Sequence, residues 1–386
     1  MHDEHLIKVK MEDALDALID YRGKTPKKSS CGISTLSAKS VKNGFIDYSQ
    51  CYFISEDEYK KFMVRGFPKK GDILLTTEAP LGLVAKLDRN DVAVAQRLLT
   101  LRGKKGLLDN DYLLYYLQSS AGQAALKARE SGTTVTGIKQ AEFRKIELLL
   151  PSIDNQKRIA SILSSLDEKI KNDAQINHNL EEQAKAIFKS WFVDFEPFQN
   201  GKFVDSELGK IPEGWRLGTV KDMLEVRYGK DHKQLATGTI PVYGSGGLMR
   251  YVEKALYNGE SVLIPRKGTL NNVMLVTGKF WTVDTMFYSI PRKTGAAKYL
   301  YHILSNLDLA SMNSGSAVPS MTTDILNTIK IFLPLDSVLT KFDNLTSYLW
   351  KKIEINKQEI QKLTQLRDTL LPKLMSGEID VSEVEV

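Results

Sequence analysis

Two parts of the chain place basic, amide and hydroxyl side chains beside glycines, a combination that suits contact with nucleic acid. Lys and Arg on loops attract phosphates, while Asn, Arg and Tyr next to glycine can approach base edges closely. The first part is Tyr21-Arg22-Gly23-Lys24-Thr25-Pro26-Lys27-Lys28-Ser29, followed by Lys39 and Lys42. The second comprises Arg227-Tyr228-Gly229-Lys230, Tyr243-Gly244-Ser245-Gly246-Gly247 and Arg266-Lys267-Gly268-Thr269-Leu270-Asn271-Asn272.

A cluster of this kind is by itself typical of a solvated surface, but its recurrence in both halves of the chain favours contact with DNA. The candidate DNA-binding residues are Arg22, Lys24, Thr25, Lys27, Lys28, Ser29, Lys39, Lys42, Arg227, Lys230, Tyr243, Ser245, Arg266, Lys267, Asn271 and Asn272.

Motifs that would give the chain a reaction of its own are missing from the sequence. It has no Gly-x-x-x-x-Gly-Lys-Ser/Thr loop for nucleotide phosphates, and residues 243–249 lack the third glycine of a dinucleotide fingerprint. It also lacks the Asn/Asp-Pro-Pro-aromatic segment typical of adenine methyltransferases and the paired acidic residues with Glu-x-Lys of a nuclease metal site. His178 lies beside Asn177 in a helical segment, where a solvated position explains it better than a base or ligand. We therefore expect a non-catalytic protein that itself holds no metal or cofactor.

Composition limits the protein class further. A length of 386 residues suggests two or three folding units, and 42% apolar with 26% charged residues is ordinary for a globular protein. The sequence contains no run of about 18 apolar residues, which is the length needed to span a membrane. Its polar start, Met1–His5, does not have the pattern of a signal peptide. Two cysteines, Cys31 and Cys51, indicate a reducing compartment without a disulfide framework or structural zinc. We expect a cytoplasmic protein without membrane contact.

The chain contains an internal repeat. Ser131–Pro151 aligns with Ser314–Pro334 at an offset of 183 positions, and each segment ends in an apolar run followed by Leu-Pro. Gly71–Leu75 resembles Gly259–Leu263 more loosely, at an offset of 188. The period is too long for a solenoid, so we interpret the chain as a duplicated lobe plus helix with a pseudo-two-fold arrangement.

Each repeat ends in a long helix with apolar residues at heptad spacing, which is typical of a coiled-coil seam. The lobes connecting the helices are long enough for antiparallel pairing. Asn177 and Asn356 interrupt the seam, either to fix its register or because they face solvent. Pro372 and Ser376-Gly377 predict the end of the second helix. The candidate seam residues are Ile159, Leu166, Ile170, Asn177, Leu180, Ile187, Phe342, Leu349, Ile353, Asn356, Leu363 and Leu370.

The lobes mix short apolar runs with Gly, Pro and Ser breaks, which indicates a mixed α/β or α+β fold. The predicted organisation is a lobe over 1–150, a helix over 151–195, a second lobe over 196–333, and a second helix with an acidic tail over 334–386. The net charge of +6 resolves into +5 and +4 on the lobes and −1 and −2 on the helical segments. Positive charge therefore lies on the parts expected to contact DNA.

Three helical junctions resemble the specificity subunit of type I restriction–modification systems. They are Leu150–Ala160 with Leu166–Ile170, then Ala186–Phe192, then Leu366–Gly377. The lobe segments Gly71–Leu75 and Ile240–Gly247 are similar to the family as well, so the resemblance covers essentially the whole chain. The two repeats differ at one junction: the second repeat has Leu335–Leu339 where the first has the segment that contains Gln156. This difference weakens the internal symmetry at that point.

The resemblance implies two target recognition domains, each reading one half of a bipartite, asymmetric target in double-stranded DNA. The helices would set the gap between the halves and dock two methyltransferase subunits, with restriction subunits completing the complex. S-adenosylmethionine, ATP and Mg are then expected on those partner subunits. Two other hypotheses remain: a coiled-coil scaffold whose lobes bind proteins, and a chain with methyltransferase or nuclease activity of its own.

Overall fold

The structure is a computed structural model that describes residues 6–132, 136–312 and 320–384. Its described residues form two compact units, one from Met1–Asp173 with Gln358–Val386 and one from Ala174–Lys357. We refer to them as unit 1 and unit 2. The start of the chain at residues 1–5, and residues 133–135 and 314–318 of the repeated segments, lie outside the described residues.

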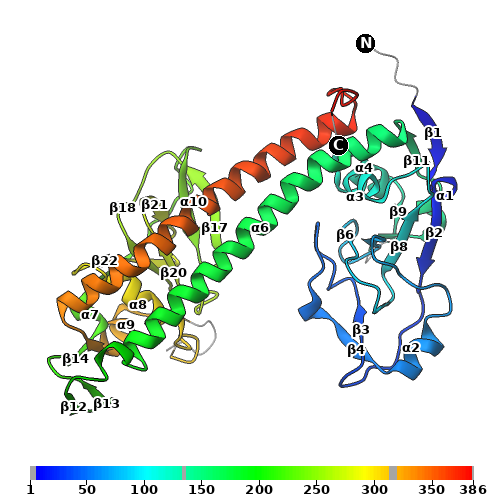
Figure 1. Ribbon diagram of the computed structural model, residues 1–386. Helices are drawn as coiled ribbons and strands as arrows, with labels where there is room; N and C mark the ends of the chain where they lie inside the picture. The colour runs from blue at the N-terminus through cyan, green and yellow to red at the C-terminus, as the bar shows by residue number, and fades with distance from the viewer. Residues whose placement is uncertain (1–5, 133–135, 313–319, 385–386) are drawn as a thin grey trace. The chain divides into compact units, whose positions relative to one another are not determined.

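Two helices of 40 residues each, α6 (Ile153–Phe192) and α10 (Asp336–Met375), contribute one half to each unit (Figure 1). Both begin with an acidic residue in the first turn and carry a lysine in the last, which complements the helix dipole. In unit 1 the first half of α6 contacts the second half of α10 through Asp167 and Arg367. In unit 2 the opposite halves meet through Asn177 and Asn356. The helices therefore run antiparallel, as predicted.

The second helix ends directly before Ser376-Gly377, as predicted, but passes through Pro372. Pro372 lies inside α10, which continues to Met375, so the prediction that this proline ends the helix is wrong. Proline removes one backbone hydrogen bond, and the loss is tolerated here near an exposed helix end. The turn is closed instead by Gly377, whose φ of +73° is the left-handed conformation that favours glycine.

The lobe of unit 1 contains a four-stranded sheet in the order β2-β8-β5-β6 and a three-stranded sheet in the order β4-β3-β7. A separate antiparallel pair, β1 with β11, connects the lobe to the start of α6. The strands are β1 Ile7–Lys10, β2 Leu15–Asp20, β3 Ile33–Leu36, β4 Tyr52–Ile54, β5 Ile73–Thr76, β6 Val84–Lys86, β7 Val92–Val94, β8 Leu98–Gly103, β9 Glu130–Ser131, β10 Gly137–Ile138 and β11 Glu147–Leu150. The helices are α1 Met11–Ala14, η1 Tyr48–Gln50, α2 Glu56–Phe62, α3 Asn110–Gln118, α4 Ser120–Lys127 and α5 Gln140–Arg144.

The lobe of unit 2 contains sheets in the orders β15-β22-β19-β20 and β17-β16-β21-β18, and β14 pairs with β23. The strands are β12 Phe203–Ser206, β13 Gly209–Pro212, β14 Arg216–Thr219, β15 Leu224–Tyr228, β16 Ile240–Gly244, β17 Gly247–Val252, β18 Tyr257–Asn258, β19 Ser261–Pro265, β20 Met274–Val276, β21 Lys279–Thr282, β22 Met286–Pro291 and β23 Lys330–Leu333. The helices are η2 Glu196–Phe198, α7 Val220–Met223, α8 Ala296–Ser305 and α9 Thr323–Thr328.

The two lobes repeat one topology. In each, a one-turn helix (α1 or α7) leads into the first strand of the main sheet (β2 or β15), and a parallel pair (β3 with β7, β16 with β21) contributes to the second sheet. The 183-residue offset relates β11 to β23, and the offset of 188 relates β5 to β19. The structure thus confirms the mixed α+β class and the internal repeat that the sequence predicts.

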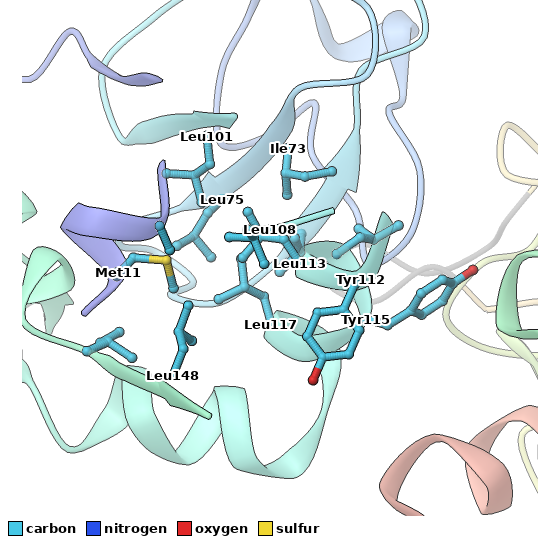
Figure 2. Packing of buried hydrophobic residues seen from close by; sticks show 14 of the residues in the cluster. Met11, Ile73, Leu75, Leu101, Leu108, Tyr112, Leu113, Tyr115, Leu117 and Leu148 are labelled. Atoms are coloured by element: carbon cyan, nitrogen blue, oxygen red, sulfur yellow. The ribbon is translucent and has the colours of Figure 1, made fainter. Parts of the chain in front are cut away.

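Each lobe has its own apolar core, which also receives one half of each long helix. In unit 1, side chains from α1, β5, β8 and α3 converge, among them Met11, Leu75, Leu101, Leu113 and Leu117 (Figure 2). The core of unit 2 is aromatic, and in it Phe192 of α6 lies 4.7 Å from Tyr299 and 4.9 Å from Phe342 between ring centroids. Burial of this kind contributes about 25 cal/mol for each Å² of apolar surface, so the helices are fixed to the lobes that their ends contact.

Candidate nucleic-acid interface

In the second lobe the structure brings two of the predicted loops into contact. The β16–β17 turn and the β19–β20 loop are joined by Asn272, whose Nδ2 donates a hydrogen bond of 2.8 Å to the carbonyl oxygen of Ser245. A Cβ atom added to Gly268 would lie 2.6 Å from Ser245 Oγ, so only glycine allows this approach. Ser245, Lys267 and Asn272 therefore belong to one surface.

Arg266 and Tyr228 extend this surface. The guanidinium of Arg266 lies over the Tyr228 ring at 5.3 Å from its centroid, and the Arg266 backbone donates to Thr285 O over 2.8 Å. Tyr228 is half exposed, although an aromatic ring of this size is normally buried. Arg stacked on an aromatic ring at a surface combines positive charge with a flat apolar face, and both features suit a nucleic acid.

The remaining predicted residues of this lobe have different environments. Arg227 is exposed but paired with Glu225 at 2.7 Å, and Lys230 is exposed after β15. Asn271 donates to Asp308 Oδ1 and accepts from the backbone of Ala310, each over 3.0 Å.

Tyr243 is half-buried, and this desolvation, together with the charge of Glu354, raises its pKa to about 12. Asn271 and Tyr243 thus have structural roles in the lobe, and their contact with DNA stays a prediction.

In the first lobe the segment after β2 is held in place by a residue that the sequence does not single out. Arg65 donates from Nη1 to the carbonyl oxygen of Asp20 over 2.8 Å, and its backbone nitrogen donates to Tyr21 Oη. Arg22 donates from Nη2 to Ile138 O over 3.1 Å. Both arginines shape the loops of this lobe. Arg65 precedes Gly66, much as Arg22 precedes Gly23, but its role depends on a contact across more than forty residues that the sequence does not reveal.

The basic residues that follow are accessible but divided between two segments. Lys24, Thr25 and Lys27 are exposed, and Lys28 lies over the Tyr52 ring at 4.9 Å from its centroid. The backbone of Ser29 donates to Phe53 O in the same strand, β4.

Lys39 is exposed and Lys42 half-buried, and their segment is attached to β6, where Gly44 N donates to Val84 O over 2.8 Å. Among the described residues, no hydrogen bond or ion pair joins this segment to Lys24–Ser29.

The two lobes repeat one further feature at this surface. An isolated β-bridge joins Glu78 to Gly137 in unit 1 and Lys267 to Ser320 in unit 2. In unit 1, Glu78 is also paired with Arg97 at 2.8 Å, and Arg97 has a φ of +72°, which is uncommon for a residue with a side chain. Sequence reasoning missed Arg97 because neither its backbone conformation nor its partner leaves a local pattern.

The long helices contact each other through some of the candidate seam residues, and the candidates differ in burial. The buried candidates are Ile159, Asn177, Leu180, Phe342, Leu349, Ile353 and Asn356, and the half-buried candidates are Leu166, Ile170, Ile187, Leu363 and Leu370. Ile159 and Phe342 pack into the lobe cores, whereas Leu180, Leu349 and Ile353 form a helix–helix cluster with Ala184. Asn177 and Asn356, the polar residues that interrupt the apolar seam, are buried and do not face solvent.

The described residues offer neither a metal site nor a membrane-spanning helix. They contain no group of three or more His, Cys, Asp or Glu side chains placed to hold a metal ion. None of their helices is both long enough and apolar enough to cross a membrane.

Two lobes of one topology, each with basic loops beside glycines and both fixed to one pair of long helices, define a recognition protein built by duplication. The chain belongs to the family described as type I restriction modification DNA specificity domain, whose model matches residues 17–182 and 212–365. It is therefore the DNA specificity subunit of a type I restriction–modification complex, a subunit that is non-catalytic. The resemblance predicted from the helical junctions is confirmed.

Individual relatives agree with this assignment. The chain is 30% identical over 359 residues to the type I restriction enzyme MjaIX specificity subunit of Methanocaldococcus jannaschii, covering 86% of this chain and 82% of that protein. It is 23% identical to the HindI specificity subunit of Haemophilus influenzae, covering 81% and 87%. The crystal structure of an S subunit from M. genitalium shares the fold, with a TM-score of 0.64, 20% identity and 97% coverage of both chains.

Proposed function

We propose that each lobe reads one half of a bipartite, asymmetric target in double-stranded DNA. The target recognition domains are residues 1–150 and 196–333, and the spacers are residues 151–195 and 334–386 with the acidic tail. The observation that carries this proposal is the repeated topology, because two lobes with the same sheet order present equivalent loops to two separate stretches of DNA. Different side chains on those loops give the two halves different sequences.

The candidate contacts with DNA are the basic and polar loop residues already described. Exposed lysines such as Lys24, Lys27 and Lys267 contact phosphates, which fixes the position of each lobe without reading sequence. Ser245, Arg266 and Asn272, on loops of unit 2 that contact each other, read base edges; the hydrogen bond between Asn272 and Ser245 supports a shared role. The net charges of +5 and +4 on the two lobes support this division of roles.

The long helices dock two methyltransferase subunits. Leu345, Tyr348 and Ile355 of α10 are 49%, 70% and 46% exposed, and their spacing of three and seven residues places them on one side of the helix. An exposed apolar stripe of this kind suits the helices of a protein partner rather than water or DNA. Restriction subunits complete the complex in the cytoplasm. S-adenosylmethionine belongs to the methyltransferase subunits, and ATP and Mg to the restriction subunits.

The test of this function is to map methylated adenines across the genome of a host that expresses the chain with its partner subunits. The expected result is a target of two short sequences separated by a fixed gap. Exchanging residues 1–150 for the corresponding lobe of a relative should change one half only, and exchanging residues 196–333 should change the other. A continuous target, or an exchange that alters both halves or neither, would contradict the proposal.

A further inference from the structure

Met249 stands out in the second lobe because it is an extra residue in its strand. Val242 of β16 pairs with Arg250 of β17, whereas the next residue, Tyr243, pairs with Leu248. Met249 therefore has no partner in the register and forms a β-bulge. Bulges redirect a side chain away from the regular alternation of the sheet and occur often at functional sites.

The bulge leaves a large apolar side chain in solvent. Met249 is 57% exposed, while Val242 and Val252 of the same hairpin are fully buried. The side chain lies over Gly244, because a Cβ added there would be 2.5 Å from Met249 Sδ. The same Cβ would be 3.7 Å from Cγ2 of Val283. Gly244 thus leaves room for the Met249 thioether, and Val283 borders the same glycine.

Val283 connects Met249 to the basic part of the surface. The two residues after it, Asp284 and Thr285, accept hydrogen bonds from Arg266, and the Arg266 backbone bond to Thr285 is 2.8 Å long. Neither Arg266 nor Lys267 forms an ion pair with the residues that the structure describes. Met249, an exposed apolar side chain, therefore lies in the same part of the lobe as the loop that carries Arg266 and Lys267, since Gly268 of that loop approaches Ser245, the residue after Gly244.

These features match the chemistry of the DNA major groove. Unpaired arginine and lysine attract the phosphates, and the major groove is wide enough for a two-stranded β-ribbon such as β16–β17. The apolar group that bases present in the major groove is the 5-methyl of thymine. Methionine is flexible and polarisable, which suits contact with a small apolar group at a wet interface.

We propose that Met249 is a specificity-determining residue of the second lobe and that it contacts the 5-methyl group of a thymine in the half-site of that lobe. The inference rests on the proposed function, since it needs a half-site for residues 196–333. Methylation of an adenine in that half-site requires an A·T pair, so at least one thymine is present. Met249 thus adds an apolar contact to the polar contacts of Ser245 and Arg266.

The experiment uses the full chain with its methyltransferase subunits and a duplex that carries the mapped target. Each thymine of the second half-site is replaced in turn by deoxyuridine, which removes only the methyl group. Binding should weaken about four-fold at one position, the effect of burying one methyl-sized group. Met249→Ala should bind the thymine duplex several-fold more weakly and should no longer distinguish it from the uracil duplex. Gly244→Ala, whose new methyl displaces the Met249 thioether, should reduce the same discrimination with Met249 still present.

Leu208→Ala provides the matched control, because Leu208 is 48% exposed but lies in the turn between β12 and β13. This variant should discriminate as the unaltered protein does. The inference is overturned if the unaltered protein binds every uracil duplex as well as the thymine duplex, or if Met249→Ala still discriminates. The uracil scan needs no folded variant, so poor folding of a mutant leaves the test intact. Absence of a bipartite target would instead refute the proposed function.

Discussion

Asn356 donates a hydrogen bond from Nδ2 to Oδ1 of Asn177 over 2.9 Å, joining α10 to α6 in unit 2. The two side chains are only 1% and 7% exposed, and the neighbouring seam residues Leu349, Ile353 and Leu180 are apolar. The bond therefore pairs a donor of Asn356 with the acceptor of Asn177 in a setting where an unpaired polar group would be costly. The sequence leaves two explanations open for these asparagines, a buried pair that fixes the register or two residues that face solvent. In the structure both side chains are buried.

We expect this pair to show strong coupling in stability. Asn356→Leu leaves the amide of Asn177 buried without its partner and should lower the free energy of unfolding by about 1–3 kcal/mol. The double variant Asn177→Leu with Asn356→Leu replaces both groups by apolar ones and should be close to the unaltered protein or more stable. Urea unfolding of the three proteins measures the coupling. Asn179→Ala, on the exposed side of α6, should have little effect; equal losses in the single and double variants would contradict the prediction.

Acid should destabilise unit 2 through His302. Burial of this side chain lowers its pKa from 6.5 to about 4, and its Nε2 has no hydrogen-bond partner among the described residues. The folded state therefore favours the neutral ring, whereas the unfolded state takes up a proton below about pH 6.5. The resulting stability is fully present above pH 6.5 and is lost as the pH falls towards 4, by roughly 3 kcal/mol.

The variant His302→Phe isolates this contribution, because it keeps a ring against Phe188, whose centroid is 5.0 Å from that of His302. Thermal unfolding between pH 7 and pH 4 should show a smaller loss of stability in the variant than in the unaltered protein. His178→Gln, at an exposed position of α6, should leave the acid dependence unchanged. Identical acid profiles for the unaltered protein and His302→Phe would show that His302 does not titrate in this way.

The segment after α10 should contribute to the stability of unit 1. Val381 is only 4% exposed in the core of unit 1, and Arg158 of α6 donates from Nε to the carbonyl oxygen of Val384 over 2.9 Å. Val381→Ala removes buried apolar volume and should lower the free energy of unfolding by about 1–2 kcal/mol. Ser382→Ala changes the adjacent exposed residue and should be neutral. Calorimetry of both variants tests this, and an unchanged unfolding temperature for Val381→Ala would refute the packing role.

The elements with continuous or regularly spaced apolar residues could be predicted from sequence. Strands β5, β8, β19 and β22 and the two long helices fall in this class, because buried strands and seam helices need such patterns. The second sheet of each lobe could not be predicted in this way, since β3, β16 and β17 are polar in part and the register of β16 with β17 is irregular. Their positions depend on contacts that only the folded chain makes.

The same distinction applies to the candidate interface. Basic residues beside glycine could be found by inspection, because both residue types are visible locally. The support that Arg65 gives to the segment after β2, the Ser245–Asn272 contact and the bulge at Met249 could not be found, since each depends on register or on long-range hydrogen bonds. Sequence therefore suggests candidate loops, while structure separates the side chains that hold these loops in place from those that are exposed on them.

Lys267 should act on DNA binding through charge alone. Its backbone forms the bridge to Ser320, but its side chain is exposed and forms no ion pair with the described residues. Lys267→Ala should weaken binding to every DNA sequence alike and reduce the slope of log K against log salt concentration by about one. Lys357→Ala removes the same charge from α10, where Lys357 lies 3.8 Å from Glu181, and should leave the slope unchanged. Titrations at several salt concentrations distinguish the two variants. A slope unaffected by Lys267→Ala, or a loss confined to the specific target, would show that this lysine does not contact phosphate.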